Sequence, residues 1–238
     1  MIPPNAIETP INNCLKFIQG LLPQDCVLCG ARSGRQLLCR GCQSSMSRIP
    51  GACPCCALPS GGVRCGECLR QAPAFDHTLA AMAYGFPLDK LIQRLKYGGQ
   101  LALAHWLGET LWQTVHTAPR PDLLLPMPLH PARLQSRGFN QALEIAKPIA
   151  RHSGIPLAPE LARRVLDTAP QATQALDARH KNIKGAFACD ADLSGRHIAL
   201  VDDVMTSGAT LNELARTLKR AGAAQISLWV VARALPHH

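Results

Sequence analysis

The chain of 238 residues is 47% hydrophobic and 17% charged, which is enough apolar material for one medium-sized domain and a smaller one. Its 25 basic and 16 acidic side chains leave a formal net charge of +9, a balance that favours phosphate-bearing partners and says little about the fold. Because no stretch reaches the ~18 apolar residues of a membrane helix, and residues 1–20 lack the pattern of an export signal, we expect a cytoplasmic protein with no membrane span.

The hydrophobic pattern divides the chain near residue 72. Residues 11–22 have the spacing of an amphipathic helix that ends at Pro23, and a cysteine-rich segment follows. Further on, the pattern predicts, in chain order, a strand over 77–84, helices over 88–97 and 101–117, a strand over 122–127, a helix over 141–152, a strand over 198–204, a helix over 211–221 and a strand over 226–232. Apolar strands that alternate with helices are typical of an α/β fold, a parallel sheet covered by helices on both faces. We therefore expect two domains, residues 1–72 and residues 73–238.

The cysteines form four pairs in which two residues separate the partners. The pairs are Cys26 and Cys29, Cys39 and Cys42, Cys53 and Cys56, and Cys65 and Cys68. A pair at this spacing on a tight turn directs two thiolates at one tetrahedral ion, so the eight cysteines predict two structural zinc sites with no position open to water. Disulfides or an iron–sulfur centre are the alternatives.

The pairing of these cysteines into sites is either sequential or crossed. Sequential pairing is favoured because the loops within each unit are short, which lowers the entropy of loop closure. Cys55 falls outside the paired spacing and is expected to bind no metal, whereas Cys14 and Cys189 are isolated and are expected to be ordinary small apolar residues. The arginines of this segment would permit contact with nucleic acid, or they form a solvated surface; they are Arg32, Arg35, Arg40, Arg48 and Arg64.

Two adjacent acids, Asp202 and Asp203, end the apolar strand that starts at Ile198. A short loop of Thr, Ser and Gly follows, and Thr210 with Glu213 has the spacing of a capping box at a helix start. The carboxyl ends of parallel strands form a ligand crevice, where loop amides and a helix N-terminus bind anions. Successive side chains on a strand point oppositely, so the two acids cannot do one identical job. Both carboxylates would accept hydrogen bonds from the hydroxyls of a ribose, and one of them could also help to bind Mg²⁺. The alternative is a helix cap with two solvated acids.

This string of residues resembles the signature of type I phosphoribosyltransferases. Ser207 stands where a second Thr is common in that signature, which keeps the hydroxyl. The resemblance implies that Asp202 and Asp203 are the catalytic residues, which hold the ribose hydroxyls of the donor, phosphoribosyl pyrophosphate. It implies that the 5-phosphate is bound by the loop residues Val204, Met205, Thr206, Ser207, Gly208, Ala209 and Thr210.

A second, basic motif follows the predicted strand over 122–127. Arg133 and Arg137 are four residues apart and would share one face of a helical turn. Arginine forks suit phosphate oxygens, so the motif predicts a pyrophosphate site, against the alternative of a surface loop with two solvated arginines. Gly138, Asn140 and Gln141 complete the run and join the expected substrate-binding residues.

Taken in order, Pro128–His130, Arg133 and Arg137–Gln141 resemble the ComF family of ComFC- and GntX-like competence proteins. Leu95–Gly99 is similar to the Leu-Lys-Tyr-x-Gly motif of that family. A further string of matching residues consists of Arg164, Thr168, Gln171, Gln174, Arg179, Asn182 and Phe187. The resemblance implies a type I phosphoribosyltransferase-like domain with an amino-terminal double zinc ribbon, and it places Arg179 among the substrate-binding residues.

The family resemblance implies a function in natural transformation, the handling of imported single-stranded DNA in the cytoplasm. The expected ligands are two structural zinc ions and Mg²⁺ bound with phosphoribosyl pyrophosphate. Single-stranded DNA and DNA-uptake or recombination proteins are the implied macromolecular partners. The activity would be phosphoribosyl transfer to an acceptor that the sequence does not name; the alternative is a non-catalytic protein that senses the donor, binds single-stranded DNA or acts as an adaptor.

The basic stretch over 163–184 is expected to close over the donor and shield the reaction from water. Its basic groups would otherwise follow a DNA backbone, with an affinity that falls as salt rises. Tyr97 and Phe139 are candidate stacking platforms for bases.

Overall fold

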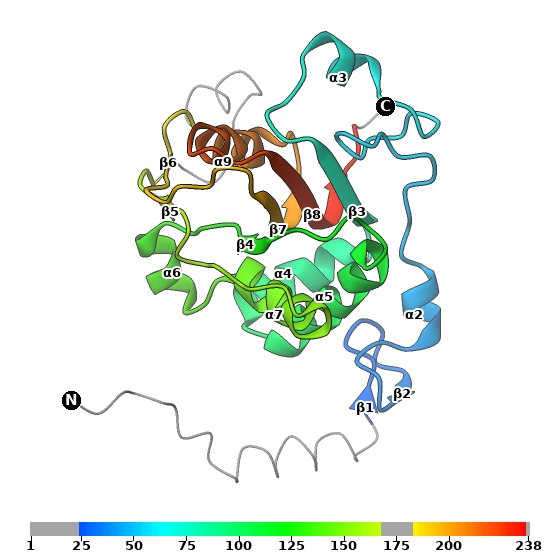
Figure 1. The fold of residues 1–238 in the computed structure, drawn as a ribbon. Helices are drawn as coiled ribbons and strands as arrows, with labels where there is room; N and C mark the ends of the chain where they lie inside the picture. The colour runs from blue at the N-terminus through cyan, green and yellow to red at the C-terminus, as the bar shows by residue number, and fades with distance from the viewer. Residues whose placement is uncertain (1–23, 168–182, 237–238) are drawn as a thin grey trace, which may run out of the picture. The chain divides into compact units, whose positions relative to one another are not determined.

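The computed structural model describes residues 24–167 and 183–236, and the chain divides into two compact units after Ser45 (Figure 1). The expected helix over 11–22 and Cys14 lie outside the described residues. So does most of the expected closing loop, with Thr168, Gln171, Gln174, Arg179 and Asn182. Within the described ranges, none of the helices has the length and apolar character needed to cross a membrane.

Between residues 24 and 45, the described part of the first unit, there are two short strands and one short helix. Strand β1 (Gln24–Asp25) pairs antiparallel with β2 (Arg32–Gly34), and α2 (Arg40–Ser44) begins after Cys39. The backbone turns sharply between Cys26 and Cys29, where the N–H of Gly30 donates to the Cys26 carbonyl over 2.9 Å. Leu38 and Cys26 are the buried apolar residues of this described segment. So small a core needs a staple such as a metal ion.

The second unit is built on a four-stranded parallel sheet in the order β3-β8-β7-β4. The strands are β3 (His77–Tyr84), β4 (Leu123–Pro126), β7 (His197–Met205) and β8 (Gln225–Ala234). The flanking helices are α4 (Leu88–Gly98), α5 (Leu101–Val115), α7 (Gln141–Ser153) and α9 (Ala209–Arg220). Helix α9 covers one face of the sheet, and α4, α5 and α7 lie on the other (Figure 1). The predicted α/β class is therefore confirmed, and each predicted strand and helix of this unit is present.

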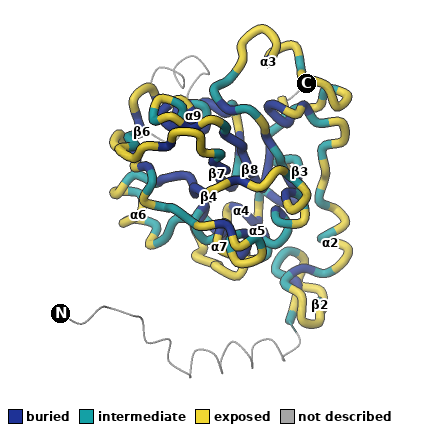
Figure 2. Tube along the Cα trace, viewed as in Figure 1, coloured by how far each residue is buried: buried dark blue, intermediate teal, exposed yellow. Residues whose placement is uncertain are grey.

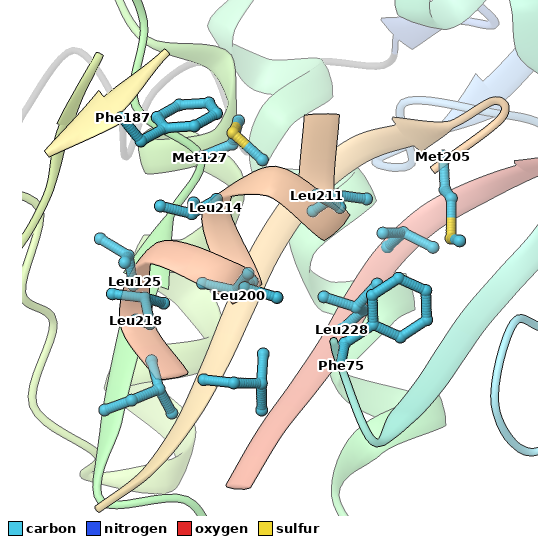
Figure 3. Packing of buried hydrophobic residues seen from close by; sticks show 14 of the residues in the cluster. Phe75, Leu125, Met127, Phe187, Leu200, Met205, Leu211, Leu214, Leu218 and Leu228 are labelled. Atoms are coloured by element: carbon cyan, nitrogen blue, oxygen red, sulfur yellow. The ribbon is translucent and has the colours of Figure 1, made fainter. Parts of the chain in front are cut away.

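The middle strands β7 and β8 are buried along most of their length (Figure 2), which explains their continuous apolar runs. On one face, Leu125, Leu200 and Leu228 of the sheet pack with Leu214 and Leu218 of α9 (Figure 3). On the other face, α5 and α7 approach so closely at Gly108 that a Cβ there would lie 2.4 Å from the Ile145 carbonyl oxygen.

Helix α9 begins two residues before its predicted start. Gly208, with φ +79°, is its N-cap residue, because only glycine adopts this left-handed conformation without strain. Thr210 is then already inside the helix, so the predicted capping box with Glu213 is wrong. The Glu213 carboxylate instead accepts a hydrogen bond from the N–H of Gly185 over 2.8 Å.

Several short elements were not expected from the sequence. They are α3 (Gly66–Arg70), α6 (Pro131–Arg137), and the antiparallel pair β5 (Arg163–Arg164) and β6 (Phe187–Ala188). Helix α6 begins with Pro131 behind His130, whose ring caps the Ala132 N–H. All are shorter than the windows over which hydrophobic periodicity is recognisable.

The segment from Met46 to Ala72 packs with the α/β unit. Thr78 of β3 donates from its N–H to the Pro54 carbonyl over 3.0 Å and from Oγ1 to the Cys55 carbonyl over 2.5 Å. The Ala83 N–H donates to the Ser47 carbonyl over 2.8 Å. The division in the structure therefore differs from the boundary expected between residues 72 and 73, and it leaves the second half of the cysteine-rich segment with the carboxy-terminal unit.

Candidate functional site

A cavity of about 200 Å³ lies where β4 and β7 end. The residues that line it are Lys96, Met127, Leu129, Arg133, Arg137, Gln141, Arg164, Asp202, Asp203, Val204, Met205, Thr206, Gly208, Ala209, Thr210 and Leu211. Most residues of the two predicted motifs are therefore brought together at one edge of the sheet, as the rule for parallel sheets leads one to expect. Ser207, Gly138 and Asn140 do not line this cavity, and Arg179 lies outside the described residues.

Asp203 is 3% exposed and forms an ion pair from Oδ2 with Nζ of Lys96. Burial by itself would raise the pKa of Asp203, but the attraction and the hydrogen bond of Lys96 lower it below its ordinary value. Burial by itself would lower the pKa of Lys96, but the charge of Asp203 raises it above its ordinary value. The pair is therefore ionised at neutral pH.

Asp202 has the opposite electrostatics, although it is the next residue along β7. Burial and then the negative charge of Asp203 raise the pKa of Asp202 well above its ordinary value. Its Oδ1 accepts the Asp203 N–H over 2.9 Å. The pKa values of two neighbouring carboxyl groups are thus shifted in opposite directions.

The loop after the acids leads directly into α9. Its turn is made by Gly208, and a Cβ at this position would lie 2.6 Å from Met205 Cε. The Asn212 N–H donates to the Gly208 carbonyl over 2.8 Å as the first bond of the helix. Backbone N–H groups ahead of that bond, together with the helix dipole, favour an anion at this end.

The basic side of the cavity is formed by Arg133, Arg137 and Arg164. Arg137 donates to Gln141 Oε1 over 2.6 Å and lies 5.8 Å from the centre of the Tyr97 ring. Gln141 in turn donates to Asp203 Oδ1 over 3.5 Å. A continuous polar chain therefore runs from the arginine wall to the carboxylates.

Gly138 and Asn140 shape this wall. Gly138 ends α6 with φ +80°, in the left-handed region. Asn140 caps α7, where its Oδ1 accepts the N–H groups of Ala142 and Leu143, and its Nδ2 donates to the Met127 carbonyl over 3.0 Å. Both residues therefore position the motif, and their expected part in substrate binding stays a prediction.

Lys96 had no assigned role in the sequence interpretation, although its motif was recognised. It lies four residues after the buried Ile92 of α4, so helical periodicity directs it toward the core, where an unpaired lysine is rarely found. Arg164 is 8% exposed, and its guanidinium lies 5.7 Å from the Phe187 ring. Burial, and then the nearby Arg133, lower its pKa.

Arg233 is a buried charge that, like Lys96, had no role in the sequence interpretation. It is 5% exposed at the end of β8. Its guanidinium donates to the carbonyls of Cys56 over 2.8 Å and Met205 over 3.1 Å, and also to that of Thr206. The signal in the sequence is a single charge at the end of an apolar strand.

The cysteines form two groups, each with Sγ atoms within 4.8 Å of one another. The first group is Cys26, Cys29, Cys39 and Cys42, and the second is Cys53, Cys56, Cys65 and Cys68. The pairing is therefore sequential, as favoured from loop length. Cys55 belongs to neither group, and its Sγ accepts from Arg64 over 3.6 Å.

The geometry of both groups fits zinc. Cys29 Sγ lies 3.7 Å from Cys39 Sγ, and Cys56 Sγ lies 3.6 Å from Cys65 Sγ, close to the ~3.8 Å between sulfurs bound tetrahedrally at a Zn–S distance of about 2.3 Å. A disulfide would need about 2.0 Å. Burial raises the pKa of Cys26 and of Cys53, but backbone N–H groups lower each to about 6. A hydrogen bond with Cys29 raises the pKa of Cys42 to about 12, and burial raises that of Cys56 to about 11, so each group has one thiol that readily forms the thiolate a metal requires.

Comparison with known proteins agrees with this architecture. The family described as the phosphoribosyl transferase domain matches residues 140–236, so the second unit belongs to the phosphoribosyltransferase fold class. Over 207 residues the chain is 34% identical to Competence protein F of Haemophilus influenzae, covering 83% of this chain and 90% of that protein. It is 33% identical to DNA utilization protein YhgH of Salmonella typhi, covering 83% and 91%, and 27% identical to Competence protein ComFC of Bacillus subtilis, covering 82% and 84%. The chain is a member of the ComF family.

Proposed function

We propose that this protein binds phosphoribosyl pyrophosphate with Mg²⁺ in the cavity at the ends of β4 and β7. The observation that carries the proposal is the placement of two buried carboxyl groups, Asp202 and Asp203, between an anion-binding loop and a wall of arginines. A ribose with a phosphate at one end and a pyrophosphate at the other presents the matching pattern of hydroxyls and negative charge.

Each part of the donor has a matching part of the cavity. Asp202 and Asp203 would accept from the ribose hydroxyls, and the loop from Thr206 to Thr210 would bind the 5-phosphate through its amides and hydroxyls. Arg133 and Arg137 would bind the pyrophosphate, since guanidinium forks match phosphate oxygens. Arg164 adds a third positive charge to the same wall.

A divalent cation also fits this arrangement. Asp203 Oδ2 is buried and already faces a cation, the ammonium group of Lys96. Mg²⁺ near Asp203 would be held by few protein ligands together with donor oxygens, and when bound it would neutralise charge on the pyrophosphate. Lys96 would then leave Asp203 and turn toward the pyrophosphate.

We further propose that the activity is phosphoribosyl transfer. The bond between the anomeric carbon and the pyrophosphate oxygen would break, pyrophosphate would depart with its electron pair, and an acceptor nucleophile would bond to that carbon and release a proton to solvent. The arginine wall would stabilise the departing charge. The acceptor must already be nucleophilic, because both carboxyl groups are assigned to the ribose.

The names of the relatives connect this chemistry with DNA. Competence protein F and DNA utilization protein YhgH are named for competence and for the use of DNA, and the net charge of +9 suits a nucleic-acid partner. We propose that this protein acts in the cytoplasm on imported single-stranded DNA or its products, with DNA-uptake or recombination proteins as partners.

Calorimetric titration of the purified chain with phosphoribosyl pyrophosphate and Mg²⁺ tests the binding proposal. Binding should be present in the wild type, weakened about tenfold or more by Arg133→Met, and unchanged by Arg196→Met, whose arginine is paired with Asp122 away from the cavity. Equal affinities in all three proteins would refute the site.

Pyrophosphate release in the presence of nucleobases, amines and single-stranded DNA tests catalysis. Release that depends on one acceptor class and disappears in Asp202→Asn would support the transferase. If the donor binds but no acceptor releases pyrophosphate, the alternative of a non-catalytic donor sensor or DNA-binding adaptor replaces it.

A further inference from the structure

The loop from Met205 to Thr210, which would bind the 5-phosphate of the donor, is called the donor loop. We propose that the second cysteine group, Cys53, Cys56, Cys65 and Cys68, holds the donor loop in its binding conformation through Arg233. Metal bound at this group would then set the affinity of a site to which it contributes no ligand. The inference rests on the proposed donor site, and it assigns to one of the two metal sites a positioning role beyond local stability.

Arg233 is the physical connection between the two sites. It lies opposite Met205 in the register of β8 with β7. Its Nε donates to the Cys56 carbonyl over 2.8 Å, and its Nη1 donates to the carbonyls of Met205 over 3.1 Å and of Thr206. One buried side chain therefore joins a predicted metal ligand to the first residues of the donor loop.

The donor loop also borders a second cavity. A cavity of about 730 Å³ lies between the loop and the cysteine segment, and its lining includes Cys56, Cys68 and Phe75 together with the loop residues 205–209. Met205, Thr206, Gly208 and Ala209 also line the donor cavity. A thin loop with space on both sides depends on a few contacts for its position, and those from Arg233 are directed at its backbone.

The position of the Cys56 carbonyl depends on the turn that the metal would hold. Cys53 donates its N–H to the Leu58 carbonyl over 2.7 Å, and Ala57 donates to the Cys53 carbonyl over 2.9 Å. Ala57 has φ +58°, and among described residues it is the non-glycine residue with a positive φ. Such strain persists only where surrounding structure maintains it, and coordination by Cys53 and Cys56 would supply that constraint.

Charge gives a second reason for the connection. The hydrogen bonds that join the Arg233 guanidinium to Cys56 and to the donor loop are accepted by neutral carbonyls, which do not by themselves offset the cost of burying its charge. Zn²⁺ bound by four thiolates has a formal charge of −2, because four negative charges exceed the two of the ion. A metal-loaded second group would therefore stabilise the cation of Arg233, whose Nε bonds to the Cys56 carbonyl, and loss of the metal would weaken this stabilisation.

The first cysteine group supplies a matched comparison, since it has the same ligand set but belongs to the other compact unit. The experiment compares Cys65→Ser/Cys68→Ser with Cys39→Ser/Cys42→Ser in the full chain. For each protein, bound zinc is measured by metal analysis, the affinity for phosphoribosyl pyrophosphate with Mg²⁺ by calorimetry, and amide exchange of residues 205–208 without donor.

Each double variant should lose one zinc ion. The second-group variant should bind the donor about tenfold or more weakly, the change expected when a charged hydrogen bond is lost, and its loop amides should exchange faster. The first-group variant should match the wild type in donor affinity and in loop exchange. Equal changes in the two variants, or no change in either, would overturn the inference.

Arg233→Lys is the control for general unfolding of the second-group variant. It keeps the positive charge but cannot reach three carbonyls at once, so it should retain both zinc ions while donor affinity falls and loop exchange rises. Wild-type affinity and exchange in Arg233→Lys would also overturn the inference. If the wild type itself fails to bind donor, the proposed function fails, and the exchange of residues 205–208 still tests the role of Arg233.

Discussion

Lys96 and Asp203 form an ion pair at the base of the donor cavity, in which the carboxylate is 4% exposed and the lysine 23% exposed. The pair joins α4 to the end of β7, two elements far apart in the sequence. It also makes the two neighbouring acids differ, because Lys96 lowers the pKa of Asp203, while burial and the charge of Asp203 raise the pKa of Asp202. This asymmetry leads to the first two predictions.

The two acids should respond oppositely to replacement by asparagine. Asp203→Asn leaves Lys96 without its carboxylate and should lower stability on the order of 2 kcal/mol, less than for a fully buried pair because Lys96 is partly exposed. Asp202→Asn replaces a buried carboxyl group, whose charged form is disfavoured by burial and by Asp203, with a neutral amide and should therefore raise the melting temperature. Both should weaken donor binding. Urea unfolding and calorimetry check this, and equal losses of stability would contradict the assignment of charge.

Stability should depend on pH through the ion pair. Lys96 lowers the pKa of Asp203, so its stabilisation is complete above the ordinary aspartate value of about 3.9 and is lost as the pH falls through the lower folded value. The difference in free energy of unfolding between wild type and Lys96→Met should therefore be largest near neutrality and shrink on acidification. Zinc loss at low pH affects both proteins, so this difference is the quantity to measure by urea titration.

Gly208→Ala should weaken donor binding, because an alanine at φ +79° is strained and moves the loop at the start of α9. Gly195→Ala is a matched control, since Gly195 has φ +75° and open space around it. Both should lose about 1 kcal/mol of stability, but only Gly208→Ala should weaken binding of phosphoribosyl pyrophosphate in calorimetry. Similar affinities for the two variants would show that the loop conformation does not matter for the donor.

Gly108→Ala should destabilise the second unit strongly, because its Cβ would lie 2.4 Å from both the Ile145 carbonyl oxygen and Pro148 Cγ. Separating α5 from α7 should reduce stability by about 2–3 kcal/mol, the range for overpacking of a core. Gly98→Ala, at the end of α4 with nothing within 4 Å, should be neutral or slightly stabilising. Thermal unfolding of the two variants tests the difference, and a tolerated Gly108→Ala would mean that the helices can move apart.

The sequence predicted those features that depend on neighbours along the chain. The strand over 77–84 was predicted with the bounds observed for β3, because its apolar run is bounded by polar and turn residues. Cysteine spacing predicted which cysteines come together in the two groups of four, and loop length predicted their sequential pairing. The start of α9 was predicted wrongly from local pattern. The left-handed φ of Gly208 determines where this helix begins, and the Glu213 carboxylate accepts a hydrogen bond from Gly185 instead of capping the helix.

Sequence reasoning missed the residues whose role depends on distant partners. Lys96 pairs with Asp203, and Arg233 bonds to the Cys56 carbonyl, across separations that periodicity cannot reveal. In both cases the sequence has a charged residue at a position where the surrounding pattern is apolar.

The hydrogen bonds from Thr78 to Pro54 and Cys55, and from Ala83 to Ser47, determine where the chain can be cut. A fragment that starts at residue 73 would remove these acceptors and expose the outer edge of β3, where unpaired strand groups promote aggregation. A fragment that starts at Met46 would retain them. The shorter fragment is therefore unsuitable for measuring donor binding without the first compact unit, and a fragment for that purpose starts after Ser45.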